Sequence, residues 1–501
     1  MRGEGQASRH RGSGALPAEI AFLTGHGVAP SLLAEAARLA ATQGVAADEA
    51  LLRTGLLAPD QFYRLLAAEL GLPYLKGPLR VDVRARFPGS VRQGAAPLDP
   101  LYHPARFAYA PRAEDVADLL ARRGRLGPGL ALTTPAALLD GVLAALGRRV
   151  ADRAANALPD ALPRRSFRDG LELRQVVVCV AALALTLAAA LAWPAATAAG
   201  LSLLASLLFL GLVVLRLASA QHRAAIRPPA APRRWPDRSL PVYTIVVPLY
   251  RERGVLARLT GALAKLDYPL TKLDIKLVVE ADDRETRDAL ARMALPGAFE
   301  IVVAPAGRPR TKPRALNVAL PLARGAFTVV YDAEDVPEPD QLRLAVAAFA
   351  RSEPDVACLQ ARLVIDNTAD NWLTRFFTVE YATLFDVINP GLCVLDLPVP
   401  LGGTSNHFRA IRQQTHPSRA RPAYGLPLSP DRFPTTLSSG TPGLHGAGPS
   451  KSGNLARHRA SYFRGRGAPG GRCHRQDWVS SMTSSSKPTS DPNCSASRIT
   501  L

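Results

Sequence analysis

The hydrophobic positions of this chain follow three different patterns from one end to the other. Near the N-terminus, leucines and a phenylalanine recur at helical spacing, and one helix is predicted to begin at Pro59 and to end before Gly71. Two uncharged runs follow, Val176–Trp193 with 18 residues and Ala195–Leu215 with 21. From residue 240 onward, short apolar runs alternate with amphipathic segments. The pattern therefore predicts a helical N-terminal part, two helices of membrane-spanning length and an α/β domain.

The alternation after residue 240 predicts a mostly parallel sheet with helices on both faces. Ligands of such a sheet bind at the carboxyl ends of its strands. Strands are predicted at Val242–Val247, Ile275–Glu280, Phe299–Ala304, Phe327–Tyr331 and Val356–Leu359, and helices at Arg253–Leu266, Arg284–Met293, Pro313–Ala323 and Pro339–Ala350.

Three acidic residues follow the predicted strand Phe327–Tyr331 within four positions: Asp332, Glu334 and Asp335. Carboxylates this close together repel one another unless a cation neutralises them. Oxygen ligands of this kind suit Mg²⁺ or Mn²⁺ held beside substrate phosphates. The segment therefore predicts a divalent metal site at a strand end, and a polar turn is the structural alternative.

Polar residues follow other strands of this region as well, and a basic segment stands at a predicted helix start. Together the segments resemble family 2 glycosyltransferases with the GT-A fold, a Rossmann-like fold of nucleotide-diphospho-sugar transferases, and the cellulose-synthase-like membrane branch in particular. The resemblance covers about residues 241–409. The segments that carry it are Val247-Pro-Leu-Tyr-Arg-Glu252, Val279-Glu-Ala-Asp-Asp283, Lys312-Pro-Arg-Ala-Leu-Asn317 and Tyr331-Asp-Ala-Glu-Asp335.

The resemblance implies a role for each matching residue in binding a UDP-sugar. Asp332 would contact ribose or metal, and either Glu334 or Asp335 would be the second metal ligand. The cations at the helix start would face the diphosphate, while Asn317 would fix the loop. The other residues implied in nucleotide binding are Tyr250 and Glu252 after the first strand, one or more of Glu280, Asp282 and Asp283 for base and ribose, and Lys312 and Arg314.

Two segments farther along resemble the saccharide-binding part of the family. Gln360 begins a strand that would face the sugar, and a loop with Gly403, Thr404 and His407 would lie at the acceptor and donor-sugar end. His407 is expected to form a hydrogen bond in that loop rather than to act as a base. Aromatic residues on a predicted helix could stack on sugar, lie at a membrane interface or pack in the core: Trp372, Phe376, Phe377, Tyr381 and Phe385.

The resemblance ends just after Arg409. The family's Thr-Glu-Asp triplet, whose Asp is the general base, and its Gln-x-x-Arg-Trp segment do not follow. Residues 411–501 are instead rich in Ser, Pro, Gly and Arg, and this composition predicts disorder. We hypothesise that the reading frame changes near codon 410, because the composition is typical of an out-of-frame GC-rich gene.

The net charge of +19 does not indicate a nucleic-acid partner. The last 91 residues contain 13 Lys and Arg against three Asp, so much of the excess lies in the tail, and no basic stripe with aromatic residues follows a folded part. The five cysteines lack CxxC spacing, which predicts reduced thiols. No apolar segment typical of a cleaved signal peptide is found near the N-terminus.

Arginines lie on the outer sides of the two uncharged runs, and the short link between the runs has no charge. The positive-inside rule therefore predicts a hairpin in a bacterial-type inner membrane with both long flanks in the cytoplasm. A buried pair of soluble helices is the alternative. We predict a disordered segment at 1–15, an N-terminal helical or α+β module at 16–160, two transmembrane helices within 175–217, a linker at 218–239, a truncated GT-A domain at 240–410 and a disordered basic tail at 411–501.

The N-terminal module resembles the helical N-terminal domain of type II secretion and pilus assembly ATPases. Leu51-Leu-Arg-Thr-Gly-Leu-Leu-Ala-Pro-Asp-Gln-Phe62 and Leu70-Gly-Leu-Pro-Tyr74 carry this resemblance. Some relatives bind cyclic di-GMP, but their full arginine-led repeat is not present here. The leading interpretation is a membrane-anchored inverting glycosyltransferase of polysaccharide biosynthesis, with a saccharide or lipid-linked acceptor. The alternative is a non-catalytic membrane scaffold or a cyclic-dinucleotide-responsive regulator.

The reading-frame hypothesis predicts that another frame of the coding DNA, read from codon 410, encodes Thr-Glu-Asp and then Gln-x-x-Arg-Trp. Translation of the genomic DNA in the two other frames checks this, and the absence of both segments from both frames would refute it. The polypeptide as written is expected to bind a UDP-sugar better than it transfers the sugar, because the general base is missing. A transfer rate equal to that of complete family members would contradict this expectation.

Overall fold

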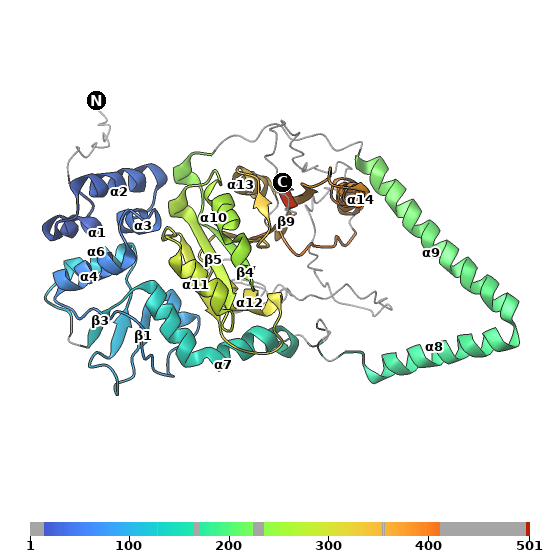
Figure 1. Cartoon of the computed structure of the whole chain (residues 1–501), viewed down its shortest axis with the longest axis horizontal. Coiled ribbons are helices and arrows are strands. Elements are labelled where there is room, and N and C mark those ends of the chain that lie inside the picture. Colours follow the sequence, from blue (N-terminus) through green and yellow to red (C-terminus); the bar gives the residue numbers. More distant parts are fainter. Residues whose placement is uncertain are drawn as a thin grey trace, which may run out of the picture.

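The computed structural model describes residues 15–127, 129–161, 163, 166, 168, 170–223, 235–352, 354, 356–395, 397–410 and 497–500. The predicted disordered segment at 1–15 lies almost entirely outside these residues, as do most of the predicted tail and part of the predicted linker. In Figure 1 the N-terminal module lies against one side of the α/β domain, and two long helices project away on the other side.

The first part of the N-terminal module is helical, as the sequence predicts. The helix α4, Pro59–Leu70, begins at the predicted proline, and Gly71 follows it in the left-handed region with φ of 66°. Glycine adopts this conformation without a steric penalty, so it ends the helix. Before α4 lie α1 at Ala18–Ala21, a 3₁₀ turn η1 at Phe22–His26, α2 at Pro30–Gln43 and α3 at Ala47–Arg53.

The second part of the module contains a small sheet in the order β1-β2-β3, in which β2 is antiparallel to β1 and parallel to β3. A long helix, α7 at Pro135–Ala161, follows this sheet and faces the α/β domain. The remaining elements are α5 at Gly89–Arg92, β1 at Ala95–Pro97, β2 at Phe107–Tyr109, α6 at Glu114–Ala121 and β3 at Leu130–Leu132.

The two uncharged runs form α8, Leu173–Ala192, and α9, Pro194–Arg223. Both helices are long and apolar enough to cross a membrane, and the tested apolar windows have no residue buried against the protein. Long apolar helices of soluble proteins are normally buried in the core. The exposure of α8 and α9 therefore favours the membrane prediction over a soluble helix pair. Crossing and orientation stay predictions.

The α/β domain is built on a six-stranded sheet in the order β6-β5-β4-β7-β11-β9. The first four strands in this order are parallel, as predicted, whereas β11 is antiparallel to both of its neighbours. The strands are β4 at Tyr243–Leu249, β5 at Leu273–Glu280, β6 at Phe299–Ala304, β7 at Phe327–Val330, β9 at Cys358–Gln360 and β11 at Asn406–Arg409.

The helices of the domain follow the predicted order, with differences at their ends. The predicted helix Arg253–Leu266 begins as a 3₁₀ turn, η4 at Arg253–Val255, and the one predicted at Pro313–Ala323 ends in another, η6 at Leu320–Leu322, where Pro321 cannot continue the α-helical hydrogen bonds. The helices are α10 at Leu256–Ala264, α11 at Arg284–Arg292, α12 at Lys312–Ala319 and α13 at Gln341–Arg351.

A second small sheet has the order β10-β12-β8, with β8 at Val336–Pro337 and β10 at Arg362–Ile365. The strand between them, β12 at Ser497–Thr500, comes from the end of the chain. No element is predicted there, because the sequence analysis assigns the whole tail to disorder. These four residues instead form a strand between β10 and β8. Pairing of this kind uses backbone groups at open strand edges, so it does not require a particular sequence.

The two faces of the large sheet contribute to two separate cores. Val246, Val278 and Val302 belong to the core that also contains the N-terminal module and α12. The residues next to them in β4 and β5, such as Ile245 and Leu277, belong to the core with α10 and α13. Side chains alternate between the faces of a strand, so burial of both faces explains the continuous apolar runs in the sequence. The module thus covers one face of the sheet.

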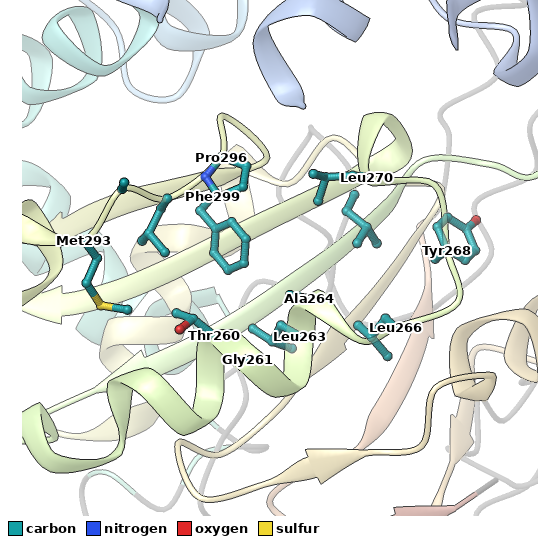
Figure 2. Close-up of a pocket in the computed structure, with 13 residues that line it drawn as sticks. Thr260, Gly261, Leu263, Ala264, Leu266, Tyr268, Leu270, Met293, Pro296 and Phe299 are labelled. Atoms are coloured by element: carbon teal, nitrogen blue, oxygen red, sulfur yellow. The ribbon is translucent and has the colours of Figure 1, made fainter. Parts of the chain in front are cut away.

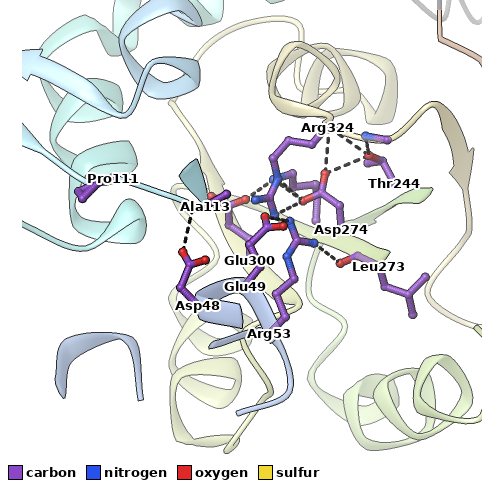
Figure 3. A network of polar contacts seen from close by, with 12 residues as sticks. Asp48, Glu49, Arg53, Pro111, Ala113, Thr244, Leu273, Asp274, Glu300 and Arg324 are labelled. Atoms are coloured by element: carbon purple, nitrogen blue, oxygen red, sulfur yellow. Dashed lines mark hydrogen bonds and ion pairs between the residues drawn. The ribbon is translucent and has the colours of Figure 1, made fainter. Parts of the chain in front are cut away.

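A buried polar network lies where the module meets the sheet (Figure 3). Arg53 of α3 donates a hydrogen bond of 2.7 Å to the Leu273 carbonyl at the start of β5. Next to it, the Asp274 carboxylate accepts hydrogen bonds from Arg324 and from the Thr244 hydroxyl. Burial opposes ionisation of Asp274, but the cations Arg324, Lys276 and Arg53 hold its pKa well below its usual range. The boundary is therefore fixed by charge pairing as well as by apolar contacts.

An apolar pocket of about 480 Å³ opens between α10 and the starts of β5 and β6 (Figure 2). Leu263, Leu266, Leu273, Met293 and Phe299 are among its lining residues. These residues lie toward the amino ends of the parallel strands. The pocket is therefore at the opposite end of the sheet from the strand ends that carry the predicted chemistry.

The substitution Asp274→Asn is expected to lower the stability of the protein by about 3 kcal/mol, because Arg324 would lose its carboxylate partner at this buried position and Lys276 would keep only Glu300. Thermal unfolding of the detergent-solubilised protein would show the loss as a fall of several degrees. Glu35→Gln is the control, since the Glu35–Arg38 pair is exposed on α2 and should leave the transition unchanged. Equal midpoints for the Asp274→Asn variant and the parent would contradict the role of the network.

Candidate active site

Four predicted segments converge at the carboxyl edge of the sheet. Because β4, β5 and β7 are parallel, the residues that follow them emerge on the same side. Tyr250 and Glu252 follow β4, Asp282 follows β5, and Asp332 follows β7. Lys312 stands at the start of α12 and points to the same edge through its bond to Asp332.

Lys312 connects the acid cluster to the glycine loop before β11. Its ammonium donates to Asp332 Oδ1 and, over 3.0 Å, to the Gly403 carbonyl. The side chains of Lys312 and Asp332 remain about one-third exposed. A cation and a carboxylate from distant parts of the chain thus meet at an accessible point of the edge.

Asp335 faces inward and stabilises the turn after β7. It accepts hydrogen bonds from the Thr404 hydroxyl and from the Asp332 N–H, the latter over 2.7 Å, and it is 3% exposed. Burial raises the pKa of Asp335 to about 7 although both donors favour the ionised form. Glu334 is exposed and has no hydrogen bond or ion pair with the residues that the structure describes. Of the two alternatives for a second ligand, the geometry leaves Glu334 accessible.

Glu252 brings a further carboxylate to the same region. Its backbone N–H donates a hydrogen bond of 3.2 Å to the Thr286 hydroxyl at the start of α11, and the residue is half-buried. Burial, followed by repulsion from Glu334, Asp283 and Asp332, raises its pKa. The acids that follow β4, β5 and β7 share this edge with two cations, since Lys312 pairs with Asp332 and Arg310 pairs with Asp282. In the described part of the chain, however, no three His, Cys, Asp or Glu side chains form a complete metal site.

Tyr250 and Asp282 are bridged by a residue that the sequence analysis did not select, Arg310. Its guanidinium donates a hydrogen bond of 3.0 Å to the Tyr250 hydroxyl and forms an ion pair of 2.9 Å with Asp282. It also lies over the Tyr250 ring, 5.7 Å from the centroid. Arg310 belongs to the loop between β6 and α12, where the sequence has several cations but no recognisable motif, so only its position just before Lys312 could have indicated it.

Asp283 has a structural role instead of the predicted contact with a nucleotide. Its carboxylate accepts a hydrogen bond of 3.1 Å from the Thr286 N–H and so caps α11. It also accepts a hydrogen bond of 2.5 Å from the Arg251 N–H. Arg251 has φ of 60°, a region that non-glycine residues rarely adopt, and the bond to Asp283 holds it there. Burial opposes ionisation, but these donors lower the pKa of Asp283. Its carboxylate is 5% exposed, which leaves Asp282 as the accessible acid of this segment.

Glu280, one of three candidates for the base and ribose contact, and Asn317, which was expected to fix the loop, are both buried. Glu280 is 5% exposed and forms a buried ion pair with Arg314, whose other guanidinium nitrogen donates 2.8 Å to the Pro305 carbonyl. Arg314 therefore does not face the edge with Lys312. Asn317 donates 2.8 Å to the Ala154 carbonyl of α7. Glu280, Arg314 and Asn317 therefore connect different elements of the structure. Their partners lie far away in the sequence, so the local sequence does not predict these contacts.

The predicted saccharide residues fall into two groups. Gly403 and Thr404 lie at the edge, through their contacts with Lys312 and Asp335. Gln360 is 1% exposed, and its amide lies against Gly402, where an added Cβ would approach to 2.7 Å. His407 was predicted to lie in a loop, but it belongs to β11. It is fully buried, and its Nδ1 lies 2.6 Å from the Tyr243 hydroxyl. His407 therefore cannot reach a sugar without opening the sheet.

The predicted aromatic helix is α14, Trp372–Thr383, and it continues into a π-helical turn, η7 at Leu384–Ile388, and into α15, Asn389–Val394. Trp372 and Phe376 are 77% and 56% exposed, so the alternative of core packing is wrong for them. Leu392 of α15 packs with Leu215 near the end of α9. This contact joins the α/β domain to the apolar hairpin.

Comparisons with known proteins agree with part of this description. Residues 241–385 match the family model described as glycosyltransferase-like family 2, which covers less than a third of the chain. The match includes the residues after β4, β5 and β7 and the start of α12. It ends before the loop of Gly403 and Thr404.

The chain is similar to three solved glycosyltransferase structures, of which it spans about half the length or less. A mannosyltransferase from Pyrobaculum calidifontis in complex with GDP-Man and Mn²⁺ is 24% identical, with 42% of this chain and 55% of that one covered and a TM-score of 0.32. TarS 1–349 from S. aureus is 20% identical, with 25% and 34% covered and a TM-score of 0.21. Glucosyl-3-phosphoglycerate synthase from Mycobacterium tuberculosis in complex with Mn²⁺, UDP and phosphoglyceric acid is 15% identical, with 34% and 56% covered and a TM-score of 0.22. No curated protein matches the chain.

The burial of His407 predicts a pH dependence of stability. Burial lowers its pKa to about 3, whereas an unfolded histidine titrates near 6.5. The unfolded state therefore binds more protons between these values, so stability is full above pH 6.5 and falls as the pH decreases, by up to about 1.4 kcal/mol per unit. The variant His407→Asn keeps a hydrogen-bonding group near Tyr243 but cannot titrate.

Thermal midpoints measured from pH 7.5 to pH 5 would test this linkage. The parent should lose more stability over this range than His407→Asn, whatever the difference between them at neutral pH. Parallel curves would show that His407 is not the group responsible.

Proposed function

We propose that residues 240–410 bind a UDP-sugar and serve glycosyl transfer to a saccharide or lipid-linked acceptor. The observation that carries this proposal is the meeting of Lys312 and Asp332 at the carboxyl edge of a parallel sheet, within a region that matches a glycosyltransferase family model. A nucleoside diphosphate has a flat base and a highly charged diphosphate. The edge offers an aromatic and polar group for the former and a group of opposite charges for the latter.

The base and ribose would bind in the half of the site formed by Tyr250, Asp282 and Arg310. Tyr250 is 36% exposed, with the guanidinium groups of Arg251 and Arg310 over its ring, and both of its polar partners are accessible at the surface. Asp332 and Lys312 form the other half, in which the ammonium can pair with phosphate oxygens. Glu252 and Glu334 are two further carboxyl groups near this edge, and their mutual repulsion contributes to the raised pKa of Glu252.

A divalent cation, Mg²⁺ or Mn²⁺, fits these residues as a partner of the donor. Asp332 and Glu334 provide two accessible carboxylates, while Asp335 is committed to Thr404 and to the turn. Protein sites for Mg²⁺ commonly use one or two carboxylates and take their remaining ligands from substrate phosphates and water. When bound, such an ion would neutralise charge on the departing diphosphate. Lys312 would supply a second positive charge there.

The proposed reaction is a single displacement with inversion. The acceptor oxygen forms a bond to the anomeric carbon, the bond from that carbon to the diphosphate oxygen breaks, and UDP leaves with the bonding electrons. The proton of the acceptor hydroxyl must pass to a base. The residues of the edge described above hold the donor, and the base that the family resemblance requires would follow Arg409. Donor binding is therefore the property that this chain should retain most fully.

The apolar hairpin supports the further proposal of membrane anchoring. The tested apolar windows of α8 and α9 contain no buried residue, and α15 packs against α9 near its C-terminal end. Arginines on both outer flanks favour cytoplasmic placement of the N-terminal module and of the α/β domain. The product class would then be a cell-surface or exported saccharide made at the inner membrane.

Isothermal titration of the full-length protein in detergent with UDP, with and without Mn²⁺, tests donor binding. UDP should bind in a Mn²⁺-dependent manner, and Asp332→Asn should weaken binding by about tenfold or more, equivalent to about 1.4 kcal/mol. Asp118→Asn, on the exposed surface of α6, is the matched control and should bind like the parent.

A parallel titration with cyclic di-GMP separates the two interpretations of the chain. Binding of the cyclic dinucleotide alone, without binding of UDP, would favour the scaffold or regulator over the transferase. Binding of UDP that is equal in the presence and absence of Mn²⁺ and insensitive to Asp332→Asn would refute the metal and donor roles of the acid cluster.

A further inference from the structure

The long helix α7 belongs to the N-terminal module but packs against the α/β domain. Its residues Val150, Ala151 and Ala154 are buried, at 4%, 3% and 5% exposure. The Ala154 carbonyl accepts the 2.8 Å bond from Asn317 of α12. The helix therefore lies directly behind the element that begins with Lys312.

The connection between β6 and α12, residues 305–311, follows the surface of α7 closely. A Cβ added to Gly307 would lie 2.7 Å from the Cβ of Ala151, closer than real Cβ contacts occur, and 3.1 Å from a terminal guanidinium nitrogen of Arg314, a flexible side chain. A Cβ added to Gly147 would lie 3.3 Å from the Cβ of Pro305. A glycine on each side thus permits the close approach, and any side chain at Gly307 would push the connection away from the helix.

The same connection carries Arg310, which bridges Tyr250 and Asp282 at the carboxyl edge. Arg310 follows Gly307, the residue in contact with α7, by three positions along the connection. The connection is also held from within the domain, since Arg314 donates to the Pro305 carbonyl and pairs with Glu280. A displacement at Gly307 would therefore move Arg310, three residues away, while Glu280 and Asp332 remain anchored by other contacts.

We propose that Ala151 and Gly307 are positioning residues, through which α7 of the N-terminal module places Arg310 for binding of the nucleobase and ribose of the donor. This inference rests on the proposed function of the site. Arg310 is the residue that touches the ligand, and α7 fixes where its guanidinium lies. The diphosphate half, with Lys312 and Asp332, lies outside this contact and keeps its geometry.

The test compares two probes on the full-length protein in the presence of Mn²⁺: UDP, which fills both halves, and inorganic pyrophosphate, which fills only the diphosphate half. Gly307→Ala should weaken UDP binding about tenfold and leave pyrophosphate binding unchanged. Adding Ala151→Gly in the same chain removes the opposing methyl group and should restore UDP affinity. Arg310→Ala should reproduce the selective loss, and Gly307→Ala should add little to it.

Gly141→Ala is the matched control, because Gly141 lies on the same helix but faces Val81 and Leu79 inside the module. This variant should lower the thermal midpoint without changing UDP affinity. Gly147→Ala, whose added Cβ would lie 3.3 Å from the Cβ of Pro305, presses on the same connection more mildly, and it serves as a second variant if Gly307→Ala does not fold. It should weaken UDP binding in the same selective way.

Unchanged UDP affinity in the folded Gly307→Ala or Gly147→Ala variant would overturn the positioning role. So would an equal loss of UDP and pyrophosphate binding, or the absence of rescue by Ala151→Gly, since either result indicates general damage to the fold. Failure of the parent protein to bind UDP with Mn²⁺ is a different result, which would remove the proposed function and this role with it.

Discussion

Burial of both faces of the large sheet is the constraint on which the rest of the structure depends. Ile245 and Leu277 point to α10 and α13 within the domain, whereas Val246 and Val278 point to α12 and the N-terminal module. Apolar burial is the main favourable term in folding, so a sheet with apolar residues on both sides needs cover on both. In this chain α12 supplies only part of the second cover, and the rest comes from residues more than 80 positions upstream of β4.

Charge pairing sharpens the same boundary. Arg53 of α3 reaches the carbonyl of Leu273, and its neighbour Asp274 is held by Arg324 and Lys276. Buried charges are costly unless they are paired, so these residues define one relative position of module and sheet more strictly than apolar contacts would. The module then acts as part of the framework that holds the carboxyl edge, and α7 extends that framework to the connection before α12.

The sequence predicts the parts of the site that depend on a strand and its end. Runs rich in Val and Ile identified β4, β5, β6 and β7, and parallel strands necessarily bring the following polar residues to one edge. By this reasoning Asp332, Lys312 and Tyr250 are expected at one edge, and in the structure Lys312 bonds to Asp332 while Tyr250 follows the neighbouring strand β4. It also selected Asp335, but the inward turn of that carboxylate toward Thr404 depends on a loop about 70 residues away.

The parts that the sequence did not predict depend on contacts between distant segments. Asn317 and Glu280 match family positions, yet Ala154 of α7 and Arg314 engage them. His407 was assigned to a loop because its segment resembles a loop of the family, whereas in the structure it belongs to β11, which pairs with β7 on one side and β9 on the other. Arg310 has no motif, and its relevance follows only from the positions of Tyr250 and Asp282.

The core shared by the module and the sheet limits how this architecture could have arisen by exchange of domains. Val302 of β6 and Leu143 of α7 belong to one core, and Gly307 fits against Ala151 with no space for a methyl group. An unrelated module joined at the same point of the gene would meet a sheet face and a connection shaped for a different partner. The two parts are therefore expected to be inherited together, and to change together at the residues where they touch.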